Sequence, residues 1–464
     1  VESTCSTPVY SNIITVTVRP ALNGGTVGSN QTICYGADVA AFSSSNPASG
    51  GEGVFTYQWQ YTTNATAPLG DPAWSDIATA TGLTYNHDTL TTTTRFVRRA
   101  IEGTCTTPVY SNILVVTVRP QLDGGAIGTD QTICYNTDVA AFTSSNPASG
   151  GAGSFTYTWQ YTTNMTIPAG DPAWVNIPSS NTATYNYGTL TATTRFIRRA
   201  VEGICTTPVY SNEVKVTVRP VLDGGIIAGN QTICSGGDVE AFTSTTAATG
   251  GAGSFTYTWQ YTTNMSATPG DGNWTDIGSS NNEIYNHGTL TTTTRFVRKA
   301  VDATCTQPVY SNVLTITVMP ALNPGAIGSD HTICSGTDVP AFTSLAPASG
   351  GAGSFTYTWQ YTTNMSASPG DGNWTDINSS NSLEYDFGTL TAKTMFVRKA
   401  EDISCTSPVY SNVVTVSINP LPVTSAITGP SVLCEDATNK VYQVVNTPGS
   451  TYAWTVPASI DNTM

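Results

Sequence analysis

The chain repeats itself every 100 residues, and this period decides what it can fold into. Two series of cysteines and one series of tryptophans keep the interval. The first cysteines are Cys34, Cys134, Cys234 and Cys334, the second are Cys105, Cys205, Cys305 and Cys405, and the tryptophans are Trp59, Trp159, Trp259 and Trp359. A block copied head to tail with little change predicts a tandem array of domains. It argues against a single catalytic constellation.

The composition excludes several classes of partner. Charged residues make up 10% of the chain, against roughly 25% in ordinary soluble proteins. The net charge of −14 argues against nucleic acid and anionic membranes, because phosphate binding needs a basic face. No apolar stretch of about 18 residues is present to span a bilayer. We therefore expect no nucleic-acid partner and no membrane insertion.

The ten cysteines indicate an oxidising compartment. The sequence contains no CxxC motif, and its three histidines, His87, His287 and His331, do not share one repeated position. Zinc sites need such ligand clusters, so we expect no metal and no cofactor. Regular cysteines in threonine-rich sequence are typical of secreted proteins. The predicted location is extracellular, at the cell surface.

Each repeat carries the pattern of short strands. Residues 155–163 (FTYTWQYTT) alternate strictly, and residues 195–203 and 212–218 follow the same rule. Alternation with period two predicts half-buried strands, and the segments between them are rich in the Gly, Pro, Asn and Asp of turns. No helical period is present. The predicted fold class is all-β, a tandem array of immunoglobulin-like antiparallel β-sandwich domains.

Two features support the immunoglobulin-like prediction. The order Cys134, Trp159, Cys205 is typical of sandwiches that pack a Trp against a disulfide. The run TTTTRFVRRAIEGTCTTPVYSNILVVTV, with YTWQYTT before it, resembles the Ig-like repeats of giant secreted surface proteins in Bacteroidota, including gliding-motility adhesins. The last segment, GPSVLCEDA through YAWTVP, resembles their PKD-like modules. The tyrosine corner of antibody domains is absent.

The period and this resemblance give the expected domains. Ig-like repeats are predicted at 20–119, 120–219, 220–319 and 320–419. Residues 1–19 match the end of the next repeat and are expected to be the C-terminal part of a further repeat. Residues 420–464 are expected to be the N-terminal part of a diverged Ig-like or PKD-like domain.

Two disulfide schemes fit the cysteine count. The favoured scheme joins the two cysteines of each repeat, Cys34 to Cys105 and onward, and leaves Cys5 and Cys434 to partners outside this stretch. The other scheme joins Cys5 to Cys34 and Cys105 to Cys134 across the linkers. Loop entropy does not separate them, because closing about 70 residues stabilises only slightly more than closing about 30. The expected Cys-Trp-Cys core favours the internal scheme.

Several repeated residues could carry chemistry, and each also has a structural interpretation. Asp123 and Asp223, with Asp130 nearby, could bind calcium, but Asn23 and Asn323 at the equivalent positions favour Asx turns. One set of tryptophans lies beside turns and could stack on sugars, although burial at a sheet edge is favoured: Trp74, Trp174, Trp274 and Trp374. One set of arginines could form a basic stripe, although structural hydrogen bonds are favoured: Arg98, Arg198, Arg298 and Arg398.

Two further motifs concern glycosylation. N-glycan sequons recur in one loop, at Asn64, Asn164, Asn264 and Asn364, and read as turn residues in a bacterium. Asp88-Thr89-Leu90 resembles a bacterial O-glycan acceptor.

These observations favour a structural role. No Ser/His/Asp set recurs and no phosphate-binding loop follows a strand, so we expect no enzyme activity. The main hypothesis is the shaft of a long extracellular adhesin or surface filament, a semi-rigid series of disulfide-stapled repeats with a short Pro-containing linker between neighbours. The alternatives are a multivalent glycan-binding array, through loops such as 78–88 and 178–188, and the spacer of a secreted hydrolase. Lateral or end-to-end self-association, and a surface or glycan ligand bound by regions outside this stretch, are the partners considered.

Overall fold

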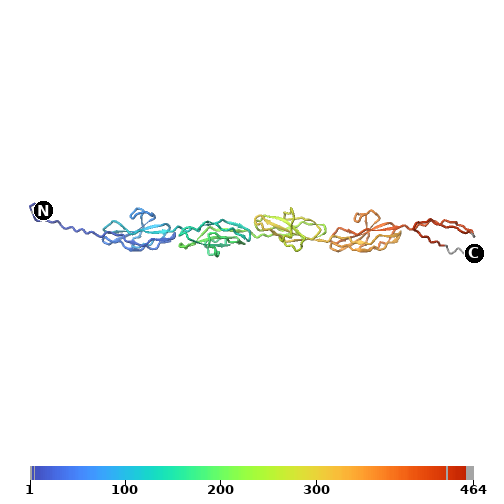
Figure 1. Ribbon diagram of the computed structural model, residues 1–464, viewed down its shortest axis with the longest axis horizontal. Helices are drawn as coiled ribbons and strands as arrows, with labels where there is room; N and C mark the ends of the chain where they lie inside the picture. Colours follow the sequence, from blue (N-terminus) through green and yellow to red (C-terminus); the bar gives the residue numbers. More distant parts are fainter. Residues whose placement is uncertain (1–2, 5, 435–436, 456–464) are drawn as a thin grey trace. The chain divides into compact units, whose positions relative to one another are not determined.

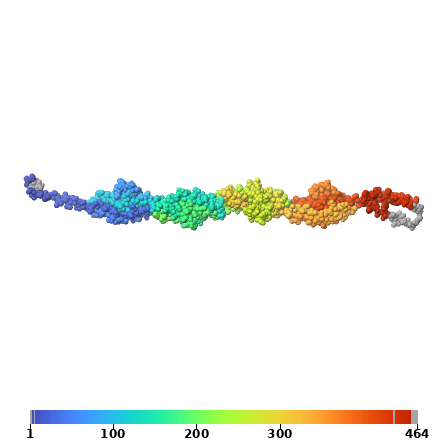
Figure 2. All heavy atoms as spheres, viewed as in Figure 1, coloured from blue at the N-terminus to red at the C-terminus, as the bar shows by residue number. Residues whose placement is uncertain are grey.

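The computed structural model describes residues 3–4, 6–434 and 437–455, and this part of the chain contains strands and turns without a helix (Figure 1). It divides into two compact units. One comprises Val1–Val221 with Gly250–Ala252, and the other comprises Leu222–Thr249 with Gly253–Met464. Each unit holds two repeats. Figure 2 shows the heavy atoms of the repeats as spheres, coloured along the sequence.

The four repeats contain the same ten strands. In the first repeat they are β1 (Thr26–Val27), β2 (Gln31–Ile33), β3 (Ala37–Asp38), β4 (Ser44–Asn46), β5 (Phe55–Thr62), β6 (Ser75–Asp76), β7 (Thr89–Leu90), β8 (Thr94–Glu102), β9 (Val109–Tyr110) and β10 (Leu114–Val118). In the second they are β11 (Ala126–Ile127), β12 (Gln131–Ile133), β13 (Thr137–Asp138), β14 (Ser144–Asn146), β15 (Phe155–Thr162), β16 (Val175–Asn176), β17 (Thr189–Leu190), β18 (Thr194–Glu202), β19 (Val209–Tyr210) and β20 (Val214–Val218).

The second unit continues the series. The third repeat has β21 (Ile226–Ala228), β22 (Gln231–Cys234), β23 (Gly237–Val239), β24 (Thr243–Thr246), β25 (Phe255–Thr262), β26 (Thr275–Asp276), β27 (Gly288–Leu290), β28 (Thr294–Asp302), β29 (Val309–Tyr310) and β30 (Leu314–Met319). The fourth has β31 (Ala326–Ile327), β32 (His331–Cys334), β33 (Thr337–Asp338), β34 (Ser344–Ala346), β35 (Phe355–Thr362), β36 (Thr375–Asp376), β37 (Thr389–Leu390), β38 (Thr394–Asp402), β39 (Val409–Tyr410) and β40 (Val414–Asn419).

One large sheet forms the frame of each repeat. In the first repeat its order is β2-β10-β8-β5-β6, with β9 also paired to β8. The short pairs β1-β4 and β3-β7, with bridges such as Phe42 to Tyr85, form the opposing layer. The all-β prediction is confirmed. The sandwich is not wholly antiparallel, however, because β2 pairs with β10 in parallel. Since β2 and β10 run in the same direction, their C-terminal ends lie at the same end of the repeat.

The main core lies between these layers. Trp59 is fully buried and stacks on Phe42 at a centroid distance of 5.5 Å, and Phe42 packs on Phe96 at 4.8 Å. The indole of Trp59 donates a hydrogen bond to the Gly82 carbonyl at 3.0 Å. Trp159, Trp259 and Trp359 are also fully buried. No cystine packs against these tryptophans in the described clusters; aromatic rings take that place.

The outer face of the large sheet is also covered, which strict alternation did not predict. Gln60 and Thr62 are buried although they alternate with the core residues. Loop 63–77 folds over this face, and Ala67, Trp74 and Val97 form a small second cluster beneath it. The central strands are therefore buried on both faces.

The described segments before and after the four repeats contain little regular secondary structure. Residues 6–19 form no strand in the structure, although they match the last strand of a repeat, and Ile14 and Val16 are exposed. Residues 420–434 and 437–455 have one isolated bridge, between Thr428 and Gln443. Trp454 is half exposed.

Candidate inter-repeat joint

Each repeat has a carboxylate buried at the end where the chain enters it. Glu102, at the end of β8, is fully buried. It accepts hydrogen bonds from the backbone N–H groups of Glu52 at 3.1 Å, Thr104 at 2.9 Å and Cys105 at 2.7 Å. The Cys105 N–H and the other amides hold the pKa of this carboxyl below its ordinary value, against the effect of burial. The acid thereby fixes the loop that carries the second cysteine; we call this segment, residues 102–105 and its equivalents, the acid loop.

The same acid loop recurs along the chain. Glu202 accepts from the Ile204 and Cys205 amides at 3.0 and 2.7 Å. Asp402 accepts from the Ser404 and Cys405 amides, both at 3.0 Å. The sequence carried a signal for it, since an acidic residue stands three positions before each second cysteine. This acidic residue was not among the predicted site residues.

The acid loop lies beside the linker that leads into its repeat. Gly151 donates to the Pro120 carbonyl at 2.9 Å, and a Cβ added at Gly151 would stand 2.8 Å from Glu202 Cγ. Gly151 has a φ of +56°, which glycine adopts without strain. Pro120, Gly151 and the acid loop therefore form the entry end of the second repeat.

The first cysteine of a repeat lies at the opposite, exit end. Cys34 follows β2, which runs parallel to β10. The backbone N–H of Arg119, just after β10, donates to the Ile33 carbonyl at 2.9 Å. Cys34 and the linker thus leave the first repeat together.

A disulfide joins the exit of one repeat to the entry of the next. Cys34 is bonded to Cys205, and Cys234 to Cys405; in both the Cα atoms are 5.8 Å apart and the sequence separation is 171. Cys134 and Cys305 are disulfide-bonded as well. The disulfide Cys34–Cys205 in one unit and the disulfide Cys234–Cys405 in the other each link two repeats.

Both predicted disulfide schemes are wrong. The internal scheme fails because Cys34 and Cys105 occupy opposite ends of one repeat, whereas a disulfide needs Cα atoms within about 7 Å. The scheme that joined Cys105 to Cys134 bridged neighbours but chose the wrong cysteines. Among the described residues, Cys105, Cys334 and Cys434 have no disulfide. Cys5 lies outside the described residues.

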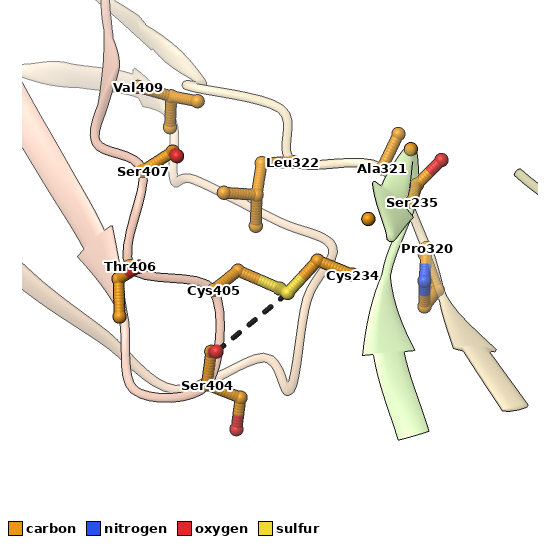
Figure 3. Close-up of a pocket in the computed structure, with 12 residues that line it drawn as sticks. Cys234, Ser235, Pro320, Ala321, Leu322, Ser404, Cys405, Thr406, Ser407 and Val409 are labelled. Atoms are coloured by element: carbon orange, nitrogen blue, oxygen red, sulfur yellow. Dashed lines mark hydrogen bonds between the residues drawn. A yellow bond between two sulfur atoms is a disulfide. The ribbon is translucent and has the colours of Figure 1, made fainter. Parts of the chain in front are cut away.

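The joint between the third and fourth repeats encloses a shallow hollow of about 370 Å³ (Figure 3). Cys234 and Cys405 cross it, and Pro320, Leu322 and Ser404 line it. The Sγ of Cys234 lies 3.7 Å from the Ser404 carbonyl oxygen. This contact is not a hydrogen bond, because the sulfur is bonded to Cys405 and carries no proton. No charged side chain lines the hollow. Its chemistry is that of a covalent joint rather than of a ligand site.

The repeated arginines are structural and form no basic stripe. Arg98 is fully buried on the inner face of β8. Its guanidinium donates to Ser44 Oγ at 2.6 Å and to the Leu83 and Asn46 carbonyls at 3.0 Å, and lies 4.7 Å from the Tyr57 ring centre. Burial lowers the pKa of the guanidinium. Arg198, Arg298 and Arg398 are likewise fully buried.

A second set of polar residues, which was not predicted from the sequence, closes each sandwich. Asn112 Oδ1 accepts a hydrogen bond from the Val27 amide at 2.7 Å, and the Ser111 hydroxyl accepts from the Arg98 amide at 3.0 Å. Asn212, Asn312 and Asn412 repeat the contact. The recurrent PVYSN motif therefore ties the last strands to β1 and β8.

The tryptophans beside turns are packed rather than offered to a ligand in the first two repeats. Trp74 is 6% exposed, and its indole donates to the Pro68 carbonyl at 2.8 Å. The Arg95 guanidinium covers its ring at 5.5 Å. Trp274 and Trp374 are partly buried.

The acidic turns and the sequons adopt local turn geometry. Asp123 Oδ1 accepts from the Gly125 amide at 2.6 Å, and Asn23 makes the same contact at 2.8 Å. In the described residues no cluster of three or more His, Cys, Asp or Glu side chains forms a metal site. Asn64 Oδ1 accepts from the Thr66 amide at 3.0 Å. Thr89 is exposed on β7.

No helix in the described part is long and apolar enough to cross a membrane.

The position held by His87 gives a test of core electrostatics. His87 packs against Phe96 at 5.0 Å and contacts the Tyr85 hydroxyl through Nδ1 at 3.0 Å. His287 repeats these contacts, whereas Tyr187 and Phe387 stand there in the other repeats. Burial lowers the pKa of both histidines.

We expect NMR titration to give midpoints below 6.5 for His87 and His287. A lowered folded pKa means that the unfolded chain binds more protons, so stability is fully present above the unfolded pKa and is lost as the pH falls through the folded one. The imidazole signals of the intact chain report this directly, since it has three histidines. His87→Phe assigns one signal and should remove the part of the acid sensitivity that His87 contributes to the first repeat, while the part due to Glu102 remains. Midpoints at or above 6.5 would contradict the prediction.

Comparison with known families accounts for most of the chain. Residues 23–120, 123–220, 223–320 and 323–420 match the model of a domain of unknown function (DUF8696). The chain belongs to this DUF8696 family. Residues 420–463 match a PKD-like domain. A search of curated proteins gave no match.

Solved structures with weak overall similarity include other multidomain arrays. The first four immunoglobulin domains of Sidekick-1 align at 12% identity over 86% of this chain and 99% of that chain, with a TM-score of 0.23. The insect immune protein hemolin aligns at 10% identity over 85% and 99%, with a TM-score of 0.25. Three domains of the bacteriophage RB49 outer capsid protein Hoc align at 13% identity over 64% and 99%, with a TM-score of 0.26.

Proposed function

We propose that this chain is the shaft of a long extracellular adhesin or surface filament, of the kind found in giant secreted proteins of Bacteroidota. One observation carries the proposal: the disulfides Cys34–Cys205 and Cys234–Cys405 each join two neighbouring repeats instead of closing one repeat. Covalent joints between consecutive domains serve a chain that transmits force or holds its length. Disulfides of this kind fit an oxidising, extracellular environment.

The chemistry of the repeated positions supports the same proposal. The repeated arginines and tryptophans are used to hold the sandwich, and the repeated acid holds the joint. What remains on the surface is largely neutral and rich in hydroxyl groups. Such a chain provides length, while recognition of a surface or glycan is left to other regions of the protein.

Immunogold electron microscopy of cells that produce the chain tests the proposal. An antibody against the second repeat should label thin fibres well beyond the cell envelope, with label spread along each fibre. Label confined to the envelope, or present only in the medium, would overturn the proposal and favour the spacer of a secreted enzyme. Strains that lack the gene provide the control.

A further inference from the structure

We propose that the inter-repeat disulfides carry tension around the sandwich cores, so that a pulled chain stays close to its folded length until the bonds are reduced. The inference deepens the proposed function and rests on it for its biological purpose. The physical basis is the connectivity alone: Cys34 with Cys205, and Cys234 with Cys405.

The covalent path of least length can be followed along the chain. Tension that enters at Pro20 runs through β1 and β2 to Cys34, and crosses there to Cys205. It then follows β19, β20 and the linker, passes through β21 and β22, and crosses from Cys234 to Cys405. From Cys405 it leaves along β40. The strands that form most of each core lie outside this path.

The path is short compared with the chain. It comprises roughly 60 of the 400 residues in the four repeats, and at about 3.5 Å per residue it cannot exceed roughly 200 Å when fully extended. The same repeats without disulfides would extend to roughly 1,400 Å. Unfolding of a sandwich core therefore adds little length while the bonds are intact.

The strands on the tension path are placed so that their hydrogen bonds resist extension. Gln31, Thr32 and Ile33 of β2 lie in parallel register with Val116, Thr117 and Val118 of β10. In the second repeat β20 on the path pairs in parallel with β12. Tension at Cys34 acts along its strand, so that several ladder hydrogen bonds oppose it together. The acid loop holds Cys205 at the other side of the joint.

Reduction should release the stored length. A dithiol such as dithiothreitol transfers two electrons and two protons to the disulfide: the Cys34–Cys205 S–S bond breaks, two cysteine thiols form, and the reagent closes to its own cyclic disulfide. The segment of 171 residues between the two cysteines then enters the load path. This corresponds to up to roughly 600 Å of added chain.

Single-molecule stretching of the 464-residue chain, held by peptide tags at its two ends, tests the inference. In the oxidised protein the four repeats should yield no extension step longer than about 100 Å, because the longest uninterrupted segment on the path, Cys205 to Cys234, is roughly 30 residues. With dithiothreitol the total extension should rise by roughly 1,200 Å. Steps of about 350 Å in the oxidised protein, the length of a whole repeat, would overturn the inference.

Matched variants separate the joint from general effects of cysteine loss. Cys34→Ser with Cys205→Ser should lengthen the oxidised chain by several hundred ångströms, whereas Cys105→Ser with Cys334→Ser, which removes two unbonded thiols, should leave it unchanged. If the first pair fails to fold, the dithiothreitol comparison still decides. Purified protein is used throughout, so a failure here leaves the cell-surface location untouched, and label absent from fibres leaves the mechanical result untouched.

Discussion

Replacing Arg98 by Met should lower the free energy of unfolding of the first repeat by about 4 kcal/mol. The guanidinium donates to Ser44 and to the Leu83 and Asn46 carbonyls in a fully buried site. Each buried acceptor left without a donor costs about 1–3 kcal/mol, and the contact with Tyr57 is lost as well. Methionine retains much of the side-chain volume, so the loss is mainly polar. Native-state hydrogen exchange of β5 and β8 measures it in this repeat alone.

The adjacent arginine is the matched control. Arg99 projects to the outer face and pairs with Asp76 at 3.1 Å, with 27% of its side chain exposed. Arg99→Met should therefore cost less than about 1 kcal/mol, as exposed ion pairs do. Arg98→Lys should resemble Arg98→Met more than the wild type, because an ammonium cannot reproduce the planar fork of donors. Equal costs for Arg98→Met and Arg99→Met would refute the assigned role.

The strands could be predicted because their pattern is local. The alternation in residues 155–163 corresponds to β15, Phe155–Thr162. The burial of Gln160 could not be predicted from alternation, because its amide hydrogen-bonds Asn176 on β16, a strand of two residues. The parallel pairing of β2 with β10 was missed for a similar reason. It joins segments more than 80 residues apart, and neither has a local mark of parallel pairing.

The role of Arg98 was indicated by its recurrence, but its surroundings were not. Its partners come from β4 and from the segments around Gly24 and Leu83, which are distant in sequence. In the fourth repeat Pro324 replaces that glycine, and Arg398 donates to Ser344, Leu383 and Ala346. A buried charge held by carbonyls rather than by an acid has no sequence signature of its own.

The disulfide pairing shows most clearly what could not be predicted from the sequence. Periodicity placed the cysteines in two equivalent series, and it could not tell which end of a sandwich each series occupies. That depends on the direction of β2 and on the position of the acid loop. The analogy with antibody domains then favoured the internal pairing. The spacing of 171 is one period plus 71 residues, so the same period is compatible with pairing inside a repeat and between repeats.

Glu202→Ala should make the Cys34–Cys205 disulfide on the order of tenfold faster to reduce. The carboxylate accepts from the amides of Ile204 and Cys205, and its loss leaves both donors without their partner, including the donor on the buried Cys205. A loop that opens more often exposes its sulfur to thiolate attack more often. Mass spectrometry of alkylated peptides at successive times in dithiothreitol gives the rate for each bond. Cys234–Cys405, held by the unchanged Asp402, is the internal standard.

The acid dependence of the same bond gives an independent check with a defined sign. Backbone hydrogen bonds, that from Cys205 first, lower the pKa of Glu202 in the folded chain. The stabilisation that the Glu202 carboxylate gives to the acid loop is therefore present above the pKa of Glu202 in the unfolded chain. It is lost as the pH falls through the pKa of Glu202 in the folded chain. Glu213→Ala, which removes only the partly exposed partner of Arg195, should leave the reduction rate unchanged. If Glu202→Ala behaved like Glu213→Ala, the acid loop would be a passive turn, and the joint would be held by the disulfide alone.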